Sequence, residues 1–407
     1  NDKIELRLDY CTALYKDETA DRILIHLKNF LSKVSEDISQ KIDNICFMSD
    51  NEYDRIVNEF NNTSRLYPAD KKIHELFEEQ VMLRPNKTAL IFEEEKLAYL
   101  ELNKKANQLA HALKKLGVGP DVLVGVCLER SVDMVVSILG ILKAGGAYVP
   151  FDPTYPRDRV EYMIKNAEVK VMLTWKRLLS KIPECNAHII CLDRERENLE
   201  KECTENLICE VQDDNLAYVI YTSGSTGAPK GAMNTHLGMR NHKLWMQDTY
   251  KLTPEDKVLQ KTPFSFDVSV WEFFWPLITG ACLVVAKPDG HKDPRYLLDK
   301  IIKHGITVIH FVPSMLKIFL ELDEVKNCTS LRHVFCSGEA LSPDLAKKFF
   351  EKFNLPLHNV YGPAECADVA TAWTCTSKDN TDSIPIGKPI SNVRIYILDR
   401  YLNPVPV

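Results

Sequence analysis

The sequence has 407 residues, 45% of them hydrophobic and 27% charged, a composition typical of a globular protein with room for more than one domain. Its formal net charge of −6 and its pI near 6.0 exclude the basic surface on which nucleic-acid binding depends. No apolar run reaches the about 20 residues that a membrane helix needs, because the best candidate, residues 134–149, contains Lys143, Gly145 and Gly146. We therefore expect a soluble protein without a nucleic-acid or membrane partner.

The first 48 residues predict one strand, residues 4–10, and one amphipathic helix. Acidic residues in the sequence DETADRIL suit the first turn of that helix. Its apolar stripe consists of Ile23, Leu24, Leu27, Phe30, Leu31 and Val34. One strand and one helix cannot form a core of their own, so we expect this segment to belong to, or to dock on, another domain. Residues 49–69 follow as a polar connection without a sustained period.

From residue 70 to residue 407, helical stripes alternate with short apolar strands. The predicted helices are residues 73–83, 99–116, 133–142, 157–166, 296–304, 316–321 and 345–353. The predicted strands are residues 89–92, 122–127, 147–149, 169–173, 217–221, 281–286, 307–311 and 333–336. Alternation of this kind is typical of βαβ units with parallel sheets, so we predict an α/β fold of two packed α/β subdomains.

The twelve cysteines have no regular spacing and form no CxxC pair, and the charged start of the chain is not a signal peptide. This pattern favours the reducing cytoplasm and free thiols. A metal site is the alternative, but the spacing of its candidate ligands matches no zinc template. Those candidates are Cys185, Cys191, Cys203 and Cys209.

A loop rich in serine, threonine and glycine follows the strand at residues 217–221. Its glycines allow backbone N–H groups to approach a ligand, its hydroxyls add donors and its lysine adds a positive charge, all of which suit a phosphate. The loop residues are Thr222, Ser223, Gly224, Ser225, Thr226, Gly227 and Lys230. A Walker loop is excluded, because Pro229 stands where its second glycine belongs and Gly231 follows the lysine. A flexible turn remains the simple alternative.

The order YTSGSTGxPKG resembles the phosphate loop of the adenylate-forming superfamily, which includes acyl-CoA synthetases, luciferases and the amino-acid adenylation domains of nonribosomal peptide synthetases. Five more segments resemble that family in the expected order: residues 97–113, 142–159, 264–277, 331–342 and 357–373. The resemblance implies the large N-terminal part of the adenylate-forming fold, ending in the start of a smaller β subdomain.

The resemblance also implies a domain order. Residues 1–48 resemble the C-terminal tail of a condensation domain, and residues 49–69 resemble the linker that joins it to an adenylation domain. Residues 70–407 resemble the adenylation core, incomplete at its C-terminal end. The family's ribose-binding aspartate and its mobile subdomain with a catalytic lysine have no counterpart in the sequence, so we expect this fragment alone to be impaired in catalysis.

For ATP and Mg²⁺ the resemblance implies roles along the phosphate loop and the segment LHNVYGPAE. Thr222, Lys230 and Glu365 would be catalytic, and Glu365 would also bind Mg²⁺. Asn359 would bind the adenine amino group and Tyr361 would stack on the base. Gly338 and Gly362 would allow close approach to the nucleotide. Two departures stand out: Ala364 where the family usually has threonine, and Ala228 where lysine is common.

The family's amino-acid pocket falls on Asp267, Val268, Trp271, His310, Phe335, Ser337, Val360, Asp368 and Val369. A carboxylate among apolar residues needs a cation, which the substrate α-ammonium would supply to Asp267. The alternative is that Asp267 caps a helix beginning near Val268. His310, taken alone, would be an ordinary core histidine.

The pocket begins Asp-Val-Trp-His-Phe-Ser, which is similar to pockets that accept serine, so serine is the first candidate substrate. Serine pockets usually place an aliphatic residue before an aspartate, whereas here Asp368 precedes Val369. An acid at this place could instead bind a longer cationic side chain, such as that of ornithine, lysine or arginine. Trp271 argues against a pocket deep enough for one.

The implied reaction is attack of an amino-acid carboxylate on ATP, giving aminoacyl-AMP and pyrophosphate. The aminoacyl group would then pass to the phosphopantetheine thiol of a carrier protein, within a synthetase that makes secondary metabolites such as antibiotics. Two alternatives remain open. One is an acyl- or aryl-acid ligase, against which Asp267 argues. The other is a non-catalytic recognition module, which the departures at Ala364 and Ala228 suggest.

Overall fold

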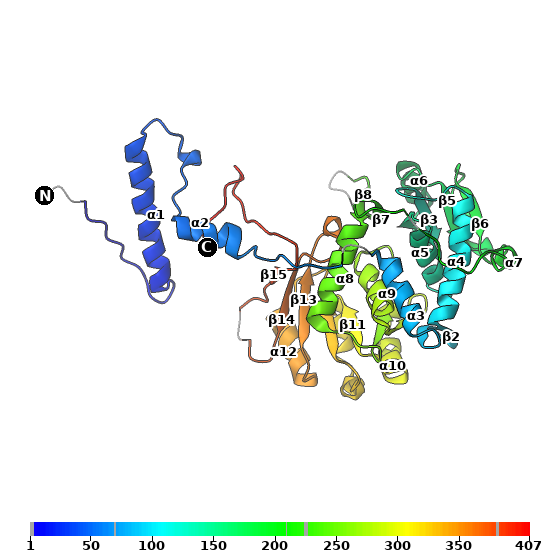
Figure 1. Ribbon diagram of the computed structural model, residues 1–407. Helices are drawn as coiled ribbons and strands as arrows, with labels where there is room; N and C mark the ends of the chain where they lie inside the picture. Colours follow the sequence, from blue (N-terminus) through cyan, green and yellow to red (C-terminus); the bar gives the residue numbers. More distant parts are fainter. Residues whose placement is uncertain (1–3, 69–70, 209, 224–226, 380–381) are drawn as a thin grey trace. The chain divides into compact units, whose positions relative to one another are not determined.

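The structure is a computed structural model that describes residues 4–68, 71–208, 210–223, 227–379 and 382–407 (Figure 1). It contains two compact units. One is Leu66–Ser391, and the other combines Asn1–Arg65 with Asn392–Val407. We describe each unit separately.

The larger sheet of Leu66–Ser391 has the strand order β15-β14-β13-β12-β11-β9-β10-β1-β2. Neighbouring strands from β13 to β1 run parallel, while β14, β15 and β2 pair antiparallel at the two edges. Its strands are β1 (Thr88–Phe92), β2 (Glu95–Ala98), β9 (Lys257–Gln260), β10 (Cys282–Val285), β11 (Val308–Phe311), β12 (His333–Cys336), β13 (Leu357–Tyr361), β14 (Thr371–Cys375) and β15 (Lys388–Pro389).

The smaller sheet has the order β6-β5-β3-β4-β7-β8 and is parallel except for the last pair, which forms an antiparallel hairpin. One apolar core contains Val124 and Leu173 of this sheet together with Leu90 and Leu283 of the larger sheet, so both sheets belong to one folded unit. The strands are β3 (Leu123–Cys127), β4 (Ala147–Pro150), β5 (Val171–Thr174), β6 (His188–Cys191), β7 (Leu216–Thr222) and β8 (Lys230–Thr235).

Local signals in the sequence set the ends of the helices. α10 (Pro294–His304) begins after Asp293, whose carboxylate accepts hydrogen bonds from two backbone N–H groups, and it ends at Gly305 with a φ of 63°. α9 (Val268–Thr279) is apolar all round and packs against α3, α8, β9 and β10. The other helices of this unit are α3 (Ile73–Leu83), α4 (Tyr99–Lys115), α5 (Val132–Lys143), α6 (Arg157–Asn166), α7 (Arg196–Leu199), α8 (His236–Tyr250), α11 (Pro313–Phe319) and α12 (Pro343–Lys352).

The predicted α/β class with two mostly parallel sheets is confirmed. Each helix and strand predicted between residues 73 and 353 is present, with ends shifted by a few residues. The predicted strand at residues 4–10 is wrong. These residues form no helix or strand, they pair with no strand of the described chain, and Ile4 is 89% exposed. A strand gains stability from pairing and from a buried face, and residues 4–10 have neither.

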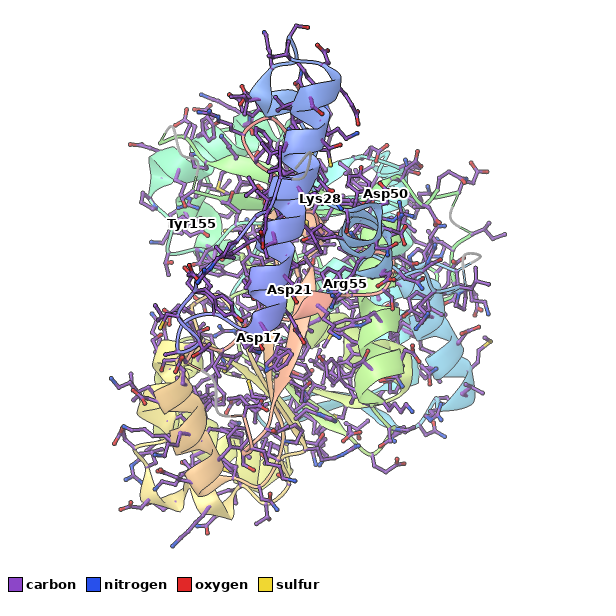
Figure 2. All side chains as sticks on the ribbon, turned by 90° about the vertical axis from the view of Figure 1, so that its left-hand side faces the viewer. Asp17, Asp21, Lys28, Asp50, Arg55 and Tyr155 are labelled. Carbon is purple, nitrogen blue, oxygen red and sulfur yellow. The ribbon has the colours of Figure 1, made fainter. Side chains whose placement is uncertain are left out.

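In the second unit, α1 (Asp17–Glu36) confirms the predicted helix, and Figure 2 shows its acidic residues Asp17 and Asp21 near one end. Its apolar stripe is only half covered: Ile23 and Leu27 are more than 40% exposed. The predicted connection at residues 49–69 contains helical turns, α2 (Asp50–Asp54) and η2 (Arg55–Glu59), after a 3-10 turn η1 (Ile42–Asn44). The hydroxyl of Ser49 caps α2, and five-residue helices are too short to show a period.

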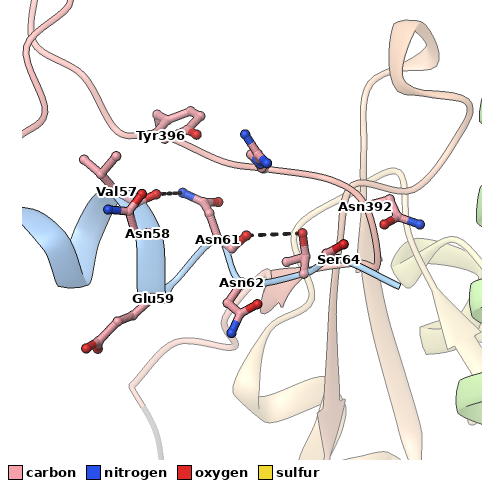
Figure 3. Close-up of a pocket in the computed structure, with 10 residues that line it drawn as sticks. Val57, Asn58, Glu59, Asn61, Asn62, Ser64, Asn392 and Tyr396 are labelled. Atoms are coloured by element: carbon pink, nitrogen blue, oxygen red, sulfur yellow. Dashed lines mark hydrogen bonds between the residues drawn. The ribbon is translucent and has the colours of Figure 1, made fainter. Parts of the chain in front are cut away.

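Two asparagine side chains tie residues 61–65 to residues 392–395; they are those of Asn61 and Asn392, both labelled in Figure 3. The amide of Asn61 donates to the carbonyl of Ile395 at 3.1 Å and accepts from its N–H group at 2.7 Å. The amide of Asn392 binds both backbone groups of Arg65 in the same way, at 3.0 and 2.9 Å. We call these four bonds the asparagine clamp; it lies beside a polar groove of about 770 Å³.

Two findings bear on the remaining sequence expectations. Among the described residues, no helix combines the length and the apolar character needed to cross a membrane. The eleven described cysteines are free thiols, and Cys209 lies outside the described residues. The proposed boundaries at residues 48 and 69 stay predictions.

We expect Asn61→Ala to destabilise the unit that contains it. The substitution leaves the N–H and carbonyl groups of Ile395 without their partner, which costs about 1–3 kcal/mol when such groups are buried. Urea unfolding measures the change. The exposed neighbour Asn62 is the control, since Asn62→Ala removes the same amide from solvent. Equal stability of the two variants would contradict the role of the clamp.

His74 of α3 and His236 of α8 form a buried pair with ring centroids 6.1 Å apart. Burial lowers the pKa of His236 to about 4, and it also lowers the pKa of His74 well below the usual value. At mildly acidic pH the unfolded chain therefore binds protons at His74 and His236, whereas the folded chain leaves these histidines neutral. Stability must fall as the pH drops from about 6.5 toward 4.

The His236→Gln variant should lose less stability on acidification than the wild-type protein. Between pH 7 and pH 5 the difference should be about 2 kcal/mol, since one pKa unit corresponds to about 1.4 kcal/mol. Urea unfolding at the two pH values gives the result. His188→Gln removes an exposed imidazole and serves as the control. Parallel pH profiles of His236→Gln and wild type would refute the assignment.

Candidate active site

A cavity of about 420 Å³ lies at the carboxyl ends of β12 and β13. Ligands of open parallel sheets bind at this edge, because loops from neighbouring strands meet there. The cavity brings together six residues expected to bind the amino acid and four expected to bind the nucleotide: Asp267, Val268, Ser337, Val360, Asp368 and Val369, and Gly338, Asn359, Tyr361 and Gly362. It is also lined by Glu339, Ala340, Leu341, Ile384 and Ile386, which the sequence did not indicate.

The other three expected pocket residues, Trp271, His310 and Phe335, lie behind the cavity wall and are fully buried. The rings of Trp271 and Phe335 are 5.2 Å apart, so they fill the space beneath the wall. His310 Nε2 lies 2.8 Å from the hydroxyl of Ser337, which lines the cavity. Burial lowers the pKa of His310 well below its usual value, so the imidazole is neutral.

Asp267 caps α9 and also faces the cavity. Its Oδ1 accepts a hydrogen bond from the N–H group of Val268 at 2.9 Å, as the capping alternative required. Burial raises the pKa of Asp267, and the N–H group of Val268 and the nearby ammonium of Lys243 oppose that rise. Because the cap uses one carboxylate oxygen, the two roles are compatible.

Asp368 is held on the cavity wall by an unusual backbone. Its φ is 92° and that of Ala367 is 57°, both in the left-handed region that few residues with side chains adopt. A Cβ on Gly362 would lie 2.2 Å from the carbonyl oxygen of Asp368, so only glycine fits there. Burial raises the pKa of Asp368 well above its usual value, and the negative charge of Asp267 adds to the rise.

The phosphate-loop residues sit at the turn of the β7–β8 hairpin. Thr222 and Lys230 are paired across the hairpin, and the threonine hydroxyl donates to the lysine carbonyl at 3.5 Å. Ser223, Gly227 and Lys230 are exposed, while Gly224, Ser225 and Thr226 lie outside the described residues. A hairpin turn differs from the strand-to-helix turn of a Walker loop, which explains why that motif does not fit.

Glu365 is an exposed residue of the 3-10 turn η6 (Ala364–Cys366). Asn234 of β8 holds this turn at both sides: its amide donates to the carbonyl of Ala364 and accepts from the N–H group of Ala367, each at 2.9 Å. The hairpin that carries the phosphate-loop residues therefore also positions Glu365. Sequence reasoning missed Asn234, although a buried asparagine within a strand pattern is a polar residue out of place.

Two further residues were missed, His242 and Lys243 of α8. Lys243 is fully buried at a position of the helix that also carries the buried Met239 and Met246. A lysine on the apolar face of a helix needs a compensating charge, which was the available signal. Among the described residues, no group of three or more histidine, cysteine or acidic side chains could hold a metal ion by itself.

A cavity of this size at the ends of parallel strands is typical of enzymes that bind a small substrate or a nucleotide. A profile of the family described as AMP-binding enzyme matches residues 77–407. Tyrocidine synthase 3 of Brevibacillus parabrevis is 44% identical over 406 residues, which are 99% of this chain and 6% of that protein. Zwittermicin A synthase ZmaJ of Bacillus cereus is 44% identical over 345 residues, 82% of this chain and 65% of that protein.

Solved structures give the same result. The nonribosomal peptide synthetase FmoA3 matches 96% of this chain and 42% of its own length, with a TM-score of 0.87 and 28% identity, and it has also been solved with AMPPNP bound. The four-domain synthetase AB3403, bound to AMP and glycine, matches 98% of this chain and 29% of its own, with a TM-score of 0.83 and 28% identity. The chain belongs to the AMP-binding enzyme family and is an adenylation domain of the nonribosomal peptide synthetase type.

Asn234→Ala should release the turn that carries Glu365. Removing a group that orients a metal ligand typically lowers metal affinity or activity by about 10- to 100-fold. We expect ATP–pyrophosphate exchange by the full-length protein to fall by this factor and to need more Mg²⁺. The exposed Asn198→Ala is the control. Unchanged exchange in Asn234→Ala would contradict the proposed role of this turn.

Proposed function

We propose that this chain activates an amino acid as aminoacyl-AMP for transfer to a carrier protein. The observation that carries the proposal is one cavity lined by both Asp267 and the residues Asn359 and Tyr361. A carboxylate suits the α-ammonium of the substrate, and a half-exposed tyrosine beside a buried amide suits adenine. The reaction needs an amino acid and a nucleotide at adjacent positions.

In the proposed step, an oxygen of the substrate carboxylate forms a bond to the α-phosphorus of ATP. The bond from that phosphorus to the bridging oxygen breaks, and pyrophosphate leaves with the electron pair. Lys230 and the hydroxyls of Thr222 and Ser223 would bind the departing phosphates, and Asp267 would fix the substrate by its ammonium group. Glu365 offers an exposed carboxylate that suits Mg²⁺, which when bound would neutralise phosphate charge.

Serine is the first candidate substrate. The pair of His310 and Ser337 gives the cavity wall polar groups that can bond a hydroxyl. FmoA3, which is 28% identical, has been solved with α-methyl-L-serine-AMP bound. A basic amino acid is the alternative, because Asp368 lines the same cavity.

The proposed partners are the carrier protein, with its phosphopantetheine thiol, and condensation domains of the same synthetase. The relatives that support this are synthases of tyrocidine and mycosubtilin, of which this chain covers 6% and 16%. On this proposal residues 1–48 are a condensation-domain tail, residues 49–69 a linker and residues 70–407 the adenylation core. The cysteine pattern favours a cytoplasmic reaction.

The proposal is tested by ATP–pyrophosphate exchange with all the amino acids, measured on residues 1–407 and on the full-length protein. We expect exchange with one small amino acid. If the full-length protein shows no exchange with any amino acid, the alternative of a non-catalytic recognition module, suggested by Ala364 and Ala228, would be favoured. Exchange with an acid lacking the α-amine would favour an acyl- or aryl-acid ligase.

Asp267→Asn separates the substrate role from the cap. Asparagine still caps α9, so stability should hold, but it cannot balance an ammonium charge. Loss of one partner from a buried charge pair typically costs at least about 2 kcal/mol, so we expect exchange to fall by about 30-fold or more. Asp293→Asn changes the cap of α10 and is the matched control. Equal exchange activity of Asp267→Asn and Asp293→Asn would contradict the proposal that Asp267 binds the substrate ammonium.

A further inference from the structure

Residues 384–387, which we call the wall segment, form part of the cavity wall. Ile384 and Ile386 line the cavity together with Asn359 and Tyr361 of β13. The wall segment leads into β15, which pairs with β14, and β14 pairs with β13 (Figure 1). The residues expected to bind the nucleotide therefore share the cavity with a segment at the edge of the larger sheet.

Two side-chain hydrogen bonds hold the wall segment against β13 and β14. The amide of Asn359 donates to the carbonyl of Pro385 at 2.8 Å. The hydroxyl of Thr371 donates to the carbonyl of Ile386 at 2.7 Å. Asn359 and Thr371 are both buried. Thr371 lies directly opposite Tyr361 in the β13–β14 ladder, so their side chains share one face of the sheet. Asn359, two residues before Tyr361, lies on that face too.

Gly387 allows the wall segment to approach β14 very closely. Its φ is 92°, in the left-handed region that favours glycine. A Cβ at this position would lie 1.9 Å from the carbonyl oxygen of Ala372. A larger residue could not fit without a shift of the backbone. The carbonyl of Pro385, two residues earlier, therefore has a fixed place beside Asn359.

The bond to Pro385 decides how the amide of Asn359 is oriented. A backbone carbonyl can only accept a hydrogen bond, so the group beside it must be the NH₂ group of Asn359. This leaves Oδ1 for another donor. Among the described residues no group donates to Oδ1, and Asn359 lines the cavity. The amide thus offers an acceptor, and not a donor, to a ligand.

A fixed acceptor distinguishes purine bases by the substituent at position 6 of the ring. Adenine has an amino group there, which donates, whereas guanine and hypoxanthine have an oxygen, which accepts. An amide that is free to rotate could bind either kind of base, because its NH₂ group would donate to the oxygen. An amide fixed by Pro385 instead places its own oxygen against that of hypoxanthine, and two acceptors repel each other.

We propose that Thr371, acting through the wall segment, fixes the amide of Asn359 and thereby makes the site select a 6-aminopurine nucleotide over a 6-oxopurine nucleotide. Thr371 is a positioning residue here, since its hydroxyl bonds the protein backbone. The inference rests on the proposed function, because it concerns the nucleotide of the same cavity.

Nucleotide binding by the wild-type full-length protein tests the fixed amide directly. Calorimetry compares AMP, the purine ribonucleotide with only hydrogen at position 6, and IMP, which has an oxygen there. We expect the affinity to fall by about 10-fold from AMP to the purine ribonucleotide, because one hydrogen bond is lost, and by about 10-fold again to IMP. Binding of IMP as tight as that of the purine ribonucleotide, or tighter, would show that the amide rotates and would overturn the proposal.

Thr371→Val removes the hydroxyl that bonds Ile386 and nearly keeps the shape of the side chain. The ratio of AMP to IMP affinity should fall by about 10-fold, because the released amide can turn its NH₂ group toward the oxygen of IMP. Thr371→Ser keeps the hydroxyl and should keep the wild-type ratio.

Thr374→Val is the matched control for Thr371→Val. It removes a hydroxyl from the same strand, but that hydroxyl lies 3.0 Å from His358 Nδ1 and does not bond the wall segment. We expect the wild-type ratio of affinities in this variant. A wild-type ratio in Thr371→Val, or an equal loss of selectivity in the two valine variants, would overturn the role of Thr371.

These binding measurements need no amino acid, so they separate this inference from the proposed function. Absence of exchange with every amino acid would contradict the proposed function, yet the order of the three affinities would still decide the role of the wall segment. In the active enzyme, Thr371→Val should raise the KM for ATP by about 3- to 10-fold and change the KM for the amino acid by less than about twofold. An equal rise in both KM values would contradict the positioning role.

Discussion

Two carboxylates held out of bulk water on one cavity wall are the constraint on which the site depends. Burial raises the pKa of both Asp267 and Asp368, so each needs donors or a cation nearby. α9 supplies the N–H group of Val268, and α8 supplies Lys243 from behind. The packing of α8 against α9 therefore places the groups that these two carboxylates need.

Much of the fold was predictable because its signals are local. The apolar stripes of α3 and α6 and the strand at His333–Cys336 have the predicted bounds. The strand expected at residues 4–10 is absent. A strand depends on a pairing partner, and the periodicity of one segment does not reveal whether such a partner exists. The helical turns before residue 60 were missed for the opposite reason, since five residues are too few for a period.

The same distinction between local and long-range signals applies to the site. The order of motifs indicated that Asn359, Tyr361 and Asp267 would share a site, and the structure places all three on one cavity. It did not indicate Asn234, whose partners Ala364 and Ala367 are more than 100 residues away. Lys243 was missed likewise, because its meaning comes from acids on other elements. In the sequence, such long-range contacts are indicated only by a polar residue at a core position of a helix or strand.

The asparagine clamp has a consequence for changes to the sequence of the two segments that it connects. In the clamp, Asn61 and Asn392 bind the N–H and carbonyl groups of Ile395 and Arg65, and every residue except proline has both groups. The asparagine clamp therefore does not depend on the side chains of Arg65 and Ile395. A chain that keeps Asn61 and Asn392 and has no proline at residues 65 and 395 can therefore form the same four bonds.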